Sequence, residues 1–296
     1  MTKNFMEDIS IPLLTYYRLK ERKINFNEVK HSFDIDGLPF TSVSKFIEQY
    51  QDSFDSAKVA YFQAKKHNES NDIINTEHQL NDQYFLDRWK LKAEMATSKG
   101  SYIHLFSQSF PYFVKPELTE EFQVIKFFND LPANMIVVGQ ELKIFNLKFK
   151  YAGIMDLLIY DTHKNRFHLY DWKSNQKLLD DKYVKDNLNY PFNNYKATKL
   201  NKYLLQQLHY RYAFEEMFKT NTLELEITKS SKYLFDPYLK TEEASKYLRI
   251  DNKSNKMYIH IPFIIDSMSL IWIHQDNEDY KVLPLPNIRL NDFIKK

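Results

Sequence analysis

The sequence predicts an α/β protein, and two changes of pattern along the chain carry that prediction. Apolar residues recur at helical spacing in the first half of the chain, over residues 54–70, 83–110 and 118–130. Strand-like apolar segments then follow one another over residues 135–145, 148–160 and 166–173. A further helix and strand come next, so the expected architecture is a small mixed β-sheet flanked by helices.

The elements begin with a hairpin over residues 30–41. Apolar and polar side chains alternate there around an Asp-Gly pair, which favours a two-residue hairpin turn. Thr41 or Ser42 can cap a helix that covers residues 42–50. The long helical stretch that follows is rich in aromatic residues, among them Tyr61, Phe62, Tyr84, Phe85 and Trp89.

Three consecutive strands form the centre of the predicted fold. Their turns fall near Asn146 and across residues 161–165. A polar stretch then leads to a strongly amphipathic helix at 203–219, and residues 222–228 have the composition of a fourth strand. The order helix, three antiparallel strands, helix, strand predicts an α/β sandwich. The tail, 236–296, is strand-rich, and its place in the fold does not follow from the sequence.

Composition excludes several classes of function. The 296 residues include no cysteine, which excludes thiolate zinc sites, cysteine-held iron–sulfur clusters, disulfides and thiol nucleophiles. Only four glycines occur, and their spacing excludes a phosphate-binding P-loop, so a helicase motor would lie on another chain. The net charge is +2, so contact with an acidic polymer depends on local patches.

Composition also bears on location. Hydrophobic residues make up 43% of the chain, which predicts a substantial core rather than disorder. No apolar run approaches the roughly 18 residues of a membrane span, and the start of the chain lacks the pattern of a secretory signal. The expectation is a protein of the cytoplasm, or of the host cytoplasm if the source is a virus, with no membrane partner.

Two aspartates stand in apolar strands on either side of the second turn. If that turn centres between His163 and Lys164, Asp156 lies directly opposite Asp171, with Cβ atoms roughly 5 Å apart. Two ionised carboxylates at that spacing repel by about 3 kcal/mol at an effective dielectric near 20. Lys173 lies two residues beyond Asp171 and faces the same side of the sheet. Either a shared proton or a bound cation must relieve the repulsion.

Such a group of side chains suits a metal ion. Carboxylate oxygens favour Mg²⁺ or Mn²⁺. The ion would lower the pKa of a bound water and neutralise a phosphodiester, while the lysine would steady the attacking water or the developing charge. The competing interpretation is a solvated Asp-x-Lys strand pair without a catalytic role, and the opposed Asp156 in an apolar strand is the observation against it.

Two further residues are candidates for the same site. Glu141 precedes the hairpin and, on a neighbouring strand, would be a metal ligand or a base; the alternative is an edge residue paired with Lys143 or Lys150. His104 follows a Gly-Ser pair by about one helical turn, and its imidazole would complete a metal shell or orient a water. A lone helical histidine is otherwise a surface or core residue.

Substrate contacts are expected from the amphipathic helix and from the polar stretch before it. Gln206 and Tyr210 share one helix face and would hold the lysine or a phosphate, or else form a plain polar edge. Lysines and aromatic rings interleave from Lys177 through Tyr183 to Lys196. This pattern suits phosphate contacts and base stacking on an unpaired strand; the alternative is that the aromatic residues belong to the core.

Four short motifs resemble the RecB-like branch of the PD-(D/E)XK nuclease superfamily. They stand in the order of that branch, as Gly100–His104, Gly153–Asp156, Asp171–Lys173 and Gln206–Tyr210. Each motif alone is weak, but four in order are specific, and the likeness covers roughly residues 30–230. The order and spacing are similar to those of phage-type single-domain exonucleases and of mitochondrial genome maintenance exonucleases.

The resemblance implies a restriction-endonuclease-like core and a role for each matched residue. The metal ligands would be Asp156 and Asp171, with His104 as an accessory ligand. Lys173 would position the water, and the glutamine–tyrosine pair of the helix would support the site and the DNA.

The chain departs from the branch in three ways. Some relatives hold an iron–sulfur cluster through four cysteines, and this chain has none. Met155 stands where proline commonly precedes the metal-binding aspartate. Gln207 leaves the register of the glutamine motif open.

The expected function is that of a Mg²⁺-dependent DNA nuclease, an exonuclease on single-stranded or frayed ends in replication, recombination or repair. The aromatic-rich N-terminal stretch would form a helical cover over the site, which admits a threaded strand more easily than a duplex. The alternatives are a structure-specific or RNA-directed endonuclease, an inactive DNA-binding module on the same fold, and an unrelated protein with a structural aspartate pair. A helicase or recombinase on another chain is an expected partner.

The chain is expected to divide into three regions. An N-terminal hairpin and helical region covers 1–94, the nuclease core covers 95–235, and a C-terminal extension packed on the core covers 236–296.

Overall fold

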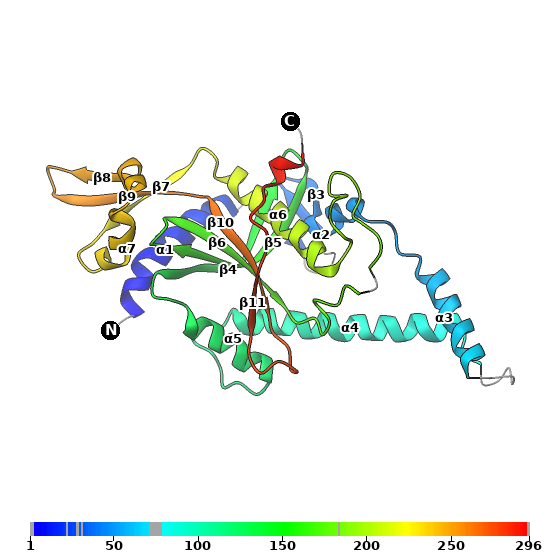
Figure 1. Ribbon diagram of the computed structural model, residues 1–296. Coiled ribbons are helices and arrows are strands. Elements are labelled where there is room, and N and C mark those ends of the chain that lie inside the picture. The colour runs from blue at the N-terminus through cyan, green and yellow to red at the C-terminus, as the bar shows by residue number, and fades with distance from the viewer. Residues whose placement is uncertain are drawn as a thin grey trace.

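A computed structural model describes residues 3–21, 23–27, 30, 32–71, 79–182 and 184–294. Within these ranges the chain is a mixed α/β structure, with an eight-stranded mixed sheet, a separate three-stranded sheet and seven α-helices (Figure 1). The expected α/β class is confirmed. His31 of the expected hairpin and Tyr183 of the expected stacking segment lie outside the described residues.

The N-terminal hairpin forms as the sequence predicts. It consists of β2 (Ser32–Ile35) and β3 (Leu38–Ser42), and a strand that was not predicted, β1 (Ile24–Asn27), pairs with β2. Asp36 and Gly37 have φ angles of 51° and 80°, as the type I′ turn of an Asp-Gly pair requires. Of the two predicted caps, Ser42 caps α2 (Val43–Ile47), because its Oγ accepts a hydrogen bond from the Lys45 amide at 3.2 Å.

Besides α2, four helices precede or follow this hairpin in the first half of the described chain. They are α1 (Lys3–Glu21), α3 (Ser56–Ser70), α4 (Asp82–Ser107) and α5 (Thr119–Asp130). The last three are the predicted ones. The helix α1 was not predicted, although Ile9, Leu13 and Tyr17 recur at four-residue spacing and are buried in the main core. Tyr17 also donates from its hydroxyl to the Lys143 carbonyl at 2.8 Å, which fixes α1 on the sheet.

Three antiparallel strands form the centre of the large sheet. They are β4 (Met135–Asn146), β5 (Tyr151–Asp161) and β6 (Arg166–Lys173). The β5–β6 register runs from Asp161 paired with Arg166 to Leu157 paired with Tyr170. The turn between these strands therefore centres between residues 163 and 164, as predicted.

The segment predicted as the fourth strand does not join the large sheet. The segment expected as the fourth strand is β7 (Thr222–Ile227), which instead joins β8 (Leu248–Asp251) and β9 (Lys256–Pro262) in the three-stranded sheet. The parallel position beside β6 is taken by β10 (Ile265–Trp272), followed by β11 (Lys281–Pro284).

The side chains of β7 and β10 explain why β10, and not β7, lies in the large sheet. Glu224 and Glu226 alternate with apolar residues along β7, so only one of its faces suits a core. A parallel strand covered on both faces needs apolar residues on both, and β10 meets that need with Leu270 and Ile271, both fully buried. Strands from all three expected regions, β3, β5 and β10, meet in the large sheet.

Helices cover both faces of the large sheet, which confirms the sandwich. The helix α6 (Lys199–Met217) packs with α1 and α2 against one face. It begins four residues before the predicted start, because Thr198 caps it through a 3.2 Å hydrogen bond from the Asn201 amide. On the other face, α4 and α5 pack Ile103 and Phe127 against β5 and β6. The last helix, α7 (Lys232–Leu239), follows β7.

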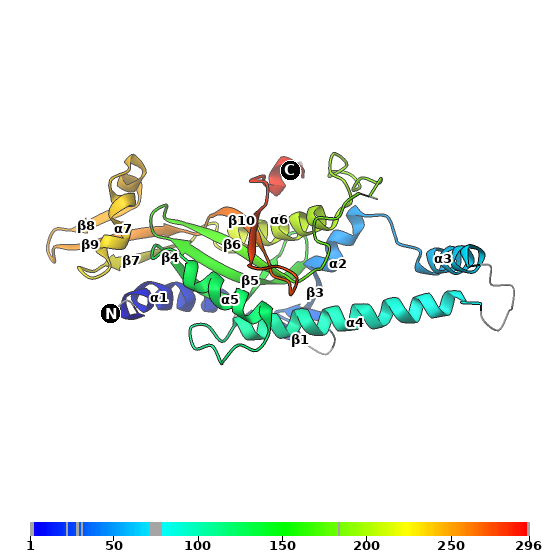
Figure 2. The same cartoon turned by 60° about the horizontal axis from the view of Figure 1, so that its bottom comes forward.

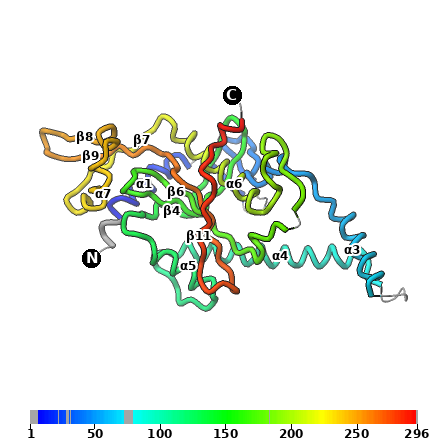
Figure 3. The backbone as a smooth tube through the Cα atoms, viewed as in Figure 1, coloured from blue at the N-terminus to red at the C-terminus, as the bar shows by residue number. Residues whose placement is uncertain are grey.

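The helix α3 and the first part of α4 form an arm that projects from the body of the protein (Figures 1 and 2). The three-stranded sheet lies at the opposite end of the molecule (Figure 3). Residues 90–98 of α4 are exposed on every side, so this part of the helix packs against nothing in the described chain. None of the described helices is long and apolar enough to cross a membrane.

Candidate metal centre

Three acidic residues stand in one row across β4, β5 and β6. The register of β4 and β5 places Glu141 opposite Asp156, between two paired positions. The register of β5 and β6, continued by one residue past the pair of Leu157 with Tyr170, places Asp156 opposite Asp171. The predicted register thus holds up to Leu157 and Tyr170, one residue short of the two aspartates, and Glu141 extends the row to a third strand.

The strand β5 changes neighbours beside this row. Its first two residues pair with β3, whereas Leu157 to Asp161 pair with β6. Between the part of β5 that pairs with β3 and the part that pairs with β6, Asp156 Oδ2 accepts a hydrogen bond from the Trp172 amide at 2.8 Å. The carboxylate thus bridges β5 and β6 beyond their last paired residues, and this contact fixes its position.

The backbone is distorted at the same place. Glu141 has a φ of 49°, a left-handed conformation that costs a residue with a Cβ atom about 1–2 kcal/mol. Along β5, Met155 and Leu158 both pack in the core on the α6 face, although strict alternation would place them on opposite faces. Strain of this size persists only where the surroundings fix it, and it gathers at functional sites.

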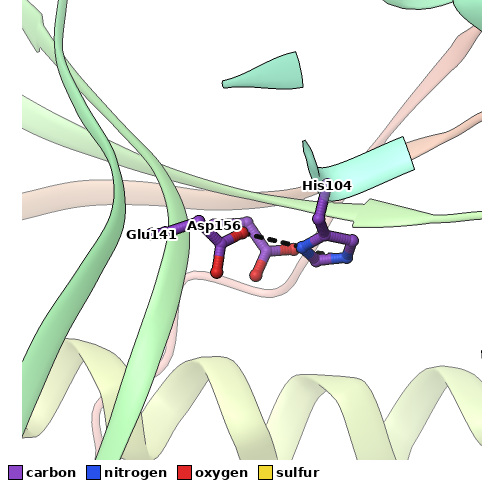
Figure 4. A group of neighbouring side chains, drawn as sticks. All are labelled: His104, Glu141 and Asp156. Atoms are coloured by element: carbon purple, nitrogen blue, oxygen red, sulfur yellow. Dashed lines mark hydrogen bonds and ion pairs between the residues drawn. The ribbon is translucent and has the colours of Figure 1, made fainter. Parts of the chain in front are cut away.

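His104, Glu141 and Asp156 come together from α4, β4 and β5, and we call these three side chains the metal group (Figure 4). His104 Nδ1 lies 2.8 Å from Glu141 Oε1, and His104 Nε2 lies 3.6 Å from Asp156 Oδ2. One ligand atom from each residue falls within 4.8 Å of the others. One imidazole nitrogen and two carboxylates in this space fit a divalent metal ion.

The charges in the metal group explain how these acids coexist in the protein without metal. Burial alone would lower the pKa of His104, but Asp156, Glu141 and Asp171 outweigh it and raise this pKa to about 9. His104 is therefore an imidazolium at neutral pH and places a cation between two carboxylates. Burial raises the pKa of Asp156, and the charges of His104 and Lys173 oppose that rise.

Asp171 lies beside the metal group and is held by two other side chains. It forms an ion pair with Lys173, and its Oδ1 accepts a hydrogen bond from Gln207 Nε2 at 2.9 Å. Burial, together with the charge of Asp156, raises the pKa of Asp171 to about 6, and Lys173 opposes this rise. Within the described chain, the three ligand atoms that lie close together belong to His104, Glu141 and Asp156. The sequence had favoured Asp171, rather than Glu141, as the third ligand.

Lys173 is a nearly buried cation. Burial would lower its pKa, but the carboxylates of Asp171 and Asp156 outweigh that effect and raise it, so the lysine stays charged. Its Nζ lies 4.5 Å from the centre of the Tyr203 ring, and the Tyr203 hydroxyl donates to Asn175 Oδ1 at 2.8 Å. The sequence analysis did not select Tyr203, although its position four residues before Gln207 places both on one face of α6.

The structure shows which of the two neighbouring glutamines on α6 reaches Asp171. Gln207 contacts Asp171, whereas Gln206 donates to the Tyr210 hydroxyl at 2.8 Å within its own helix. The predicted shared face of Gln206 and Tyr210 is confirmed. Tyr210 packs directly on Gly153, where an added Cβ atom would lie 2.6 Å from its ring. The glycine of the Gly-x-x-Asp motif therefore allows α6 to approach β5 at the site.

The remaining predicted residues lie outside the metal group. Lys177 is exposed and pairs with Asp180 at 3.8 Å. Trp89 lies fifteen residues before His104 on α4, about 22 Å along the helix. The aromatic residues of the arm therefore do not cover the metal group, and the expected helical cover is wrong (Figure 2). The helices α3 and α4, which carry these residues, pack against each other in the arm and project from the body (Figure 2).

Two comparisons of the sequence with known proteins found no match. No protein family matches this sequence, and no curated protein matches it. The function is therefore inferred from the geometry and chemistry of the site.

Proposed function

We propose that this chain is a metal-dependent DNA nuclease built on a restriction-endonuclease-like core, as its PD-(D/E)XK-like motifs indicate. The observation that carries the proposal is the position of a charged, nearly buried lysine beside a row of three acids and a histidine. Lys173 is paired with Asp171, and Asp171 lies opposite Asp156 of the metal group. The proposal is supported by His104, Asp156 and Asp171, which come from three of the four motifs and lie at or beside the metal group.

Each side chain has a defined task in this proposal. His104, Glu141 and Asp156 would hold the ion, and the ion would lower the pKa of a water and neutralise the phosphodiester. Lys173 donates a hydrogen bond to the attacking water or to a phosphate oxygen. Asp171 keeps Lys173 charged and oriented, and as the next acid in the row it is also placed to complete the ligand set.

The proposed ion is Mg²⁺ or Mn²⁺. Two or three carboxylate oxygens suit these hard ions. The proposed substrate is single-stranded or frayed DNA, cleaved from its ends in the cytoplasm during replication, recombination or repair. A helicase or recombinase on another chain would supply such ends.

A cleavage assay with matched lysine variants tests the proposal. Labelled linear DNA and RNA are incubated with Mg²⁺ or with EDTA and with the wild type, Lys173→Gln or Lys164→Gln. Lys164 is the control, because it also forms an ion pair, with Asp266 at 2.9 Å, but on the turn between β5 and β6. The wild type and Lys164→Gln should cleave DNA only with metal, and Lys173→Gln should lose about 100-fold or more of the rate.

Two results would count against the proposal. A wild type that cleaves no nucleic acid with Mg²⁺ or Mn²⁺ would contradict it, and binding without cleavage would favour an inactive DNA-binding module. Full activity in Lys173→Gln would show that hydrolysis occurs elsewhere. Faster cleavage of RNA than of DNA would change the substrate but leave the site in place.

A further inference from the structure

An open pocket of about 450 Å³ lies one strand away from Lys173. Its walls are residues 176–180, Lys182 and Trp272. Trp272 on β10 pairs in parallel register with Lys173 on β6, which separates their backbones by about 4.8 Å. We infer that this pocket receives an unpaired base of the strand whose backbone lies at the metal group. The inference rests on the proposed nuclease function and adds a base-binding site to it.

The Trp272 ring is tied to Lys173 through two residues. Its Nε1 donates a hydrogen bond to the Asn175 carbonyl at 2.8 Å. The Asn175 side chain accepts from the Tyr203 hydroxyl at 2.8 Å, and the Tyr203 ring lies under Lys173. The indole is therefore held in a fixed orientation relative to the catalytic lysine. A stacking surface that is ordered before binding costs less to use than one that must be ordered by the ligand.

The charges around the pocket match a nucleotide. Lys177 and Lys182 line it, and the Nζ atom of Lys281 lies 5.3 Å from the centre of the Trp272 ring. Asp180 is the one acid among the lining residues, and it is paired with Lys177. A planar aromatic wall next to cations provides base stacking and phosphate contacts together. An isolated anion would not use the ring, and an apolar ligand would not use the lysines.

The pocket also bears on the form of the substrate. A base that enters it must leave its own stack and its pairing partner, which costs least in a single strand. Stacking tolerates every base, because each has a π-face. The inferred site therefore selects unpaired nucleic acid next to the metal group and not a particular sequence.

Variants of Trp272 test this site. Trp272→Leu removes the ring, Trp272→Phe keeps an aromatic surface, and Tyr258→Leu is the control. Tyr258 is a matched control because its ring lies under Arg249, 4.3 Å from the guanidinium, on β9 of the three-stranded sheet. Binding is measured by fluorescence anisotropy of labelled oligothymidylate with Ca²⁺ in place of Mg²⁺, and turnover by steady-state kinetics with Mg²⁺. Thermal melts confirm that each variant is folded.

The expected result is a binding defect that depends on the ring. Trp272→Leu should raise both Kd and KM by about 5- to 100-fold, the loss typical of one base–aromatic stack, with kcat little changed. Trp272→Phe should recover most of this loss, and Tyr258→Leu should behave as the wild type.

The other outcomes separate this inference from the proposed function. If the wild type cleaves and Trp272→Leu keeps its Kd and KM, the base site is wrong and the nuclease proposal stands. If the wild type binds oligothymidylate through Trp272 but does not cleave it, the base site stands and the nuclease proposal fails. If the wild type neither binds nor cleaves, both are overturned.

Discussion

At the scale of single residues, the candidate centre is a balance of buried charges. The carboxyls of Asp156 and Asp171 have raised pKa values, so burial in the folded protein favours their neutral forms. His104 and Lys173 also have raised pKa values, so the same surroundings favour their charged forms. A divalent ion would add positive charge to this group and release the protons that now balance it.

Metal binding should therefore displace a proton from His104. At pH 7.5 the imidazole, with a pKa of about 9, is protonated, and it must be neutral to coordinate an ion. Calorimetric titration with Mn²⁺ in two buffers of different ionisation enthalpy should show release of about one proton per ion. His104→Gln should bind more weakly and without this release. Equal binding heats of the wild type in both buffers would remove His104 from the ligand set.

The same pKa predicts how the stability of the metal-free protein depends on pH. The folded pKa of His104, about 9, lies above its ordinary value of 6.5. Its contribution to the free energy of unfolding is therefore fully present below pH 6.5 and is lost as the pH rises through 9. In EDTA, the wild type should be more stable than His104→Gln at pH 6, by on the order of 3 kcal/mol, and the two should converge above pH 9. Urea unfolding at both pH values measures this, and a constant difference would contradict it.

At the scale of elements, local pattern predicted much of the fold and long-range pairing did not follow from it. The hairpin turn, the β5–β6 register and the five helices α2 to α6 follow from residues near in sequence. The position of β10 beside β6 depends on residues about 100 apart, and β7 was wrongly assigned to the large sheet. In the candidate site too, local contacts could be predicted from the sequence and long-range contacts could not. The opposed aspartates follow from one turn, whereas the pairing of His104 with Glu141 depends on how α4 packs on β4.

Two glycines of the resemblance motifs should respond in opposite ways to alanine. Gly153→Ala would place a Cβ atom 2.6 Å from Tyr210 and 3.2 Å from Val43, which should push α6 from β5 and reduce both stability and cleavage. The Cβ atom added by Gly100→Ala has no other atom within 4 Å. Because alanine favours the helical conformation more than glycine does, this substitution inside α4 should stabilise the protein by about 0.5–1 kcal/mol. Thermal melts of both variants check this. A tolerated Gly153→Ala would show that the close contact of α6 with β5 is not needed.

At the scale of the whole molecule, the metal group lies in the body of the protein between two projecting parts. The three-stranded sheet extends at one end and the arm of α3 and α4 at the other (Figures 1 and 3). The arm combines exposed aromatic side chains such as Tyr61 and Phe62 with lysines such as Lys65 and Lys66. A strand that reaches from this arm to the metal group would span about 22 Å or more.

The proposed nuclease should act from strand ends. Linear single-stranded DNA should be degraded, and a covalently closed circle of the same sequence should persist under the same conditions. The reason is that the proposed enzyme cleaves from a free strand end, which a closed circle lacks. Gel analysis of the two substrates over time measures the difference. Equal degradation of both would show entry by internal cleavage and leave the metal group unaffected.

The central claim is that His104, Glu141 and Asp156 hold a divalent ion next to Lys173. Anomalous scattering from crystals grown with Mn²⁺ tests it most directly, because it locates the ion independently of any activity. The account predicts one strong peak within about 2.0–2.3 Å of a His104 nitrogen and of one oxygen from each carboxylate. A peak elsewhere, or none at saturating Mn²⁺, would contradict the account.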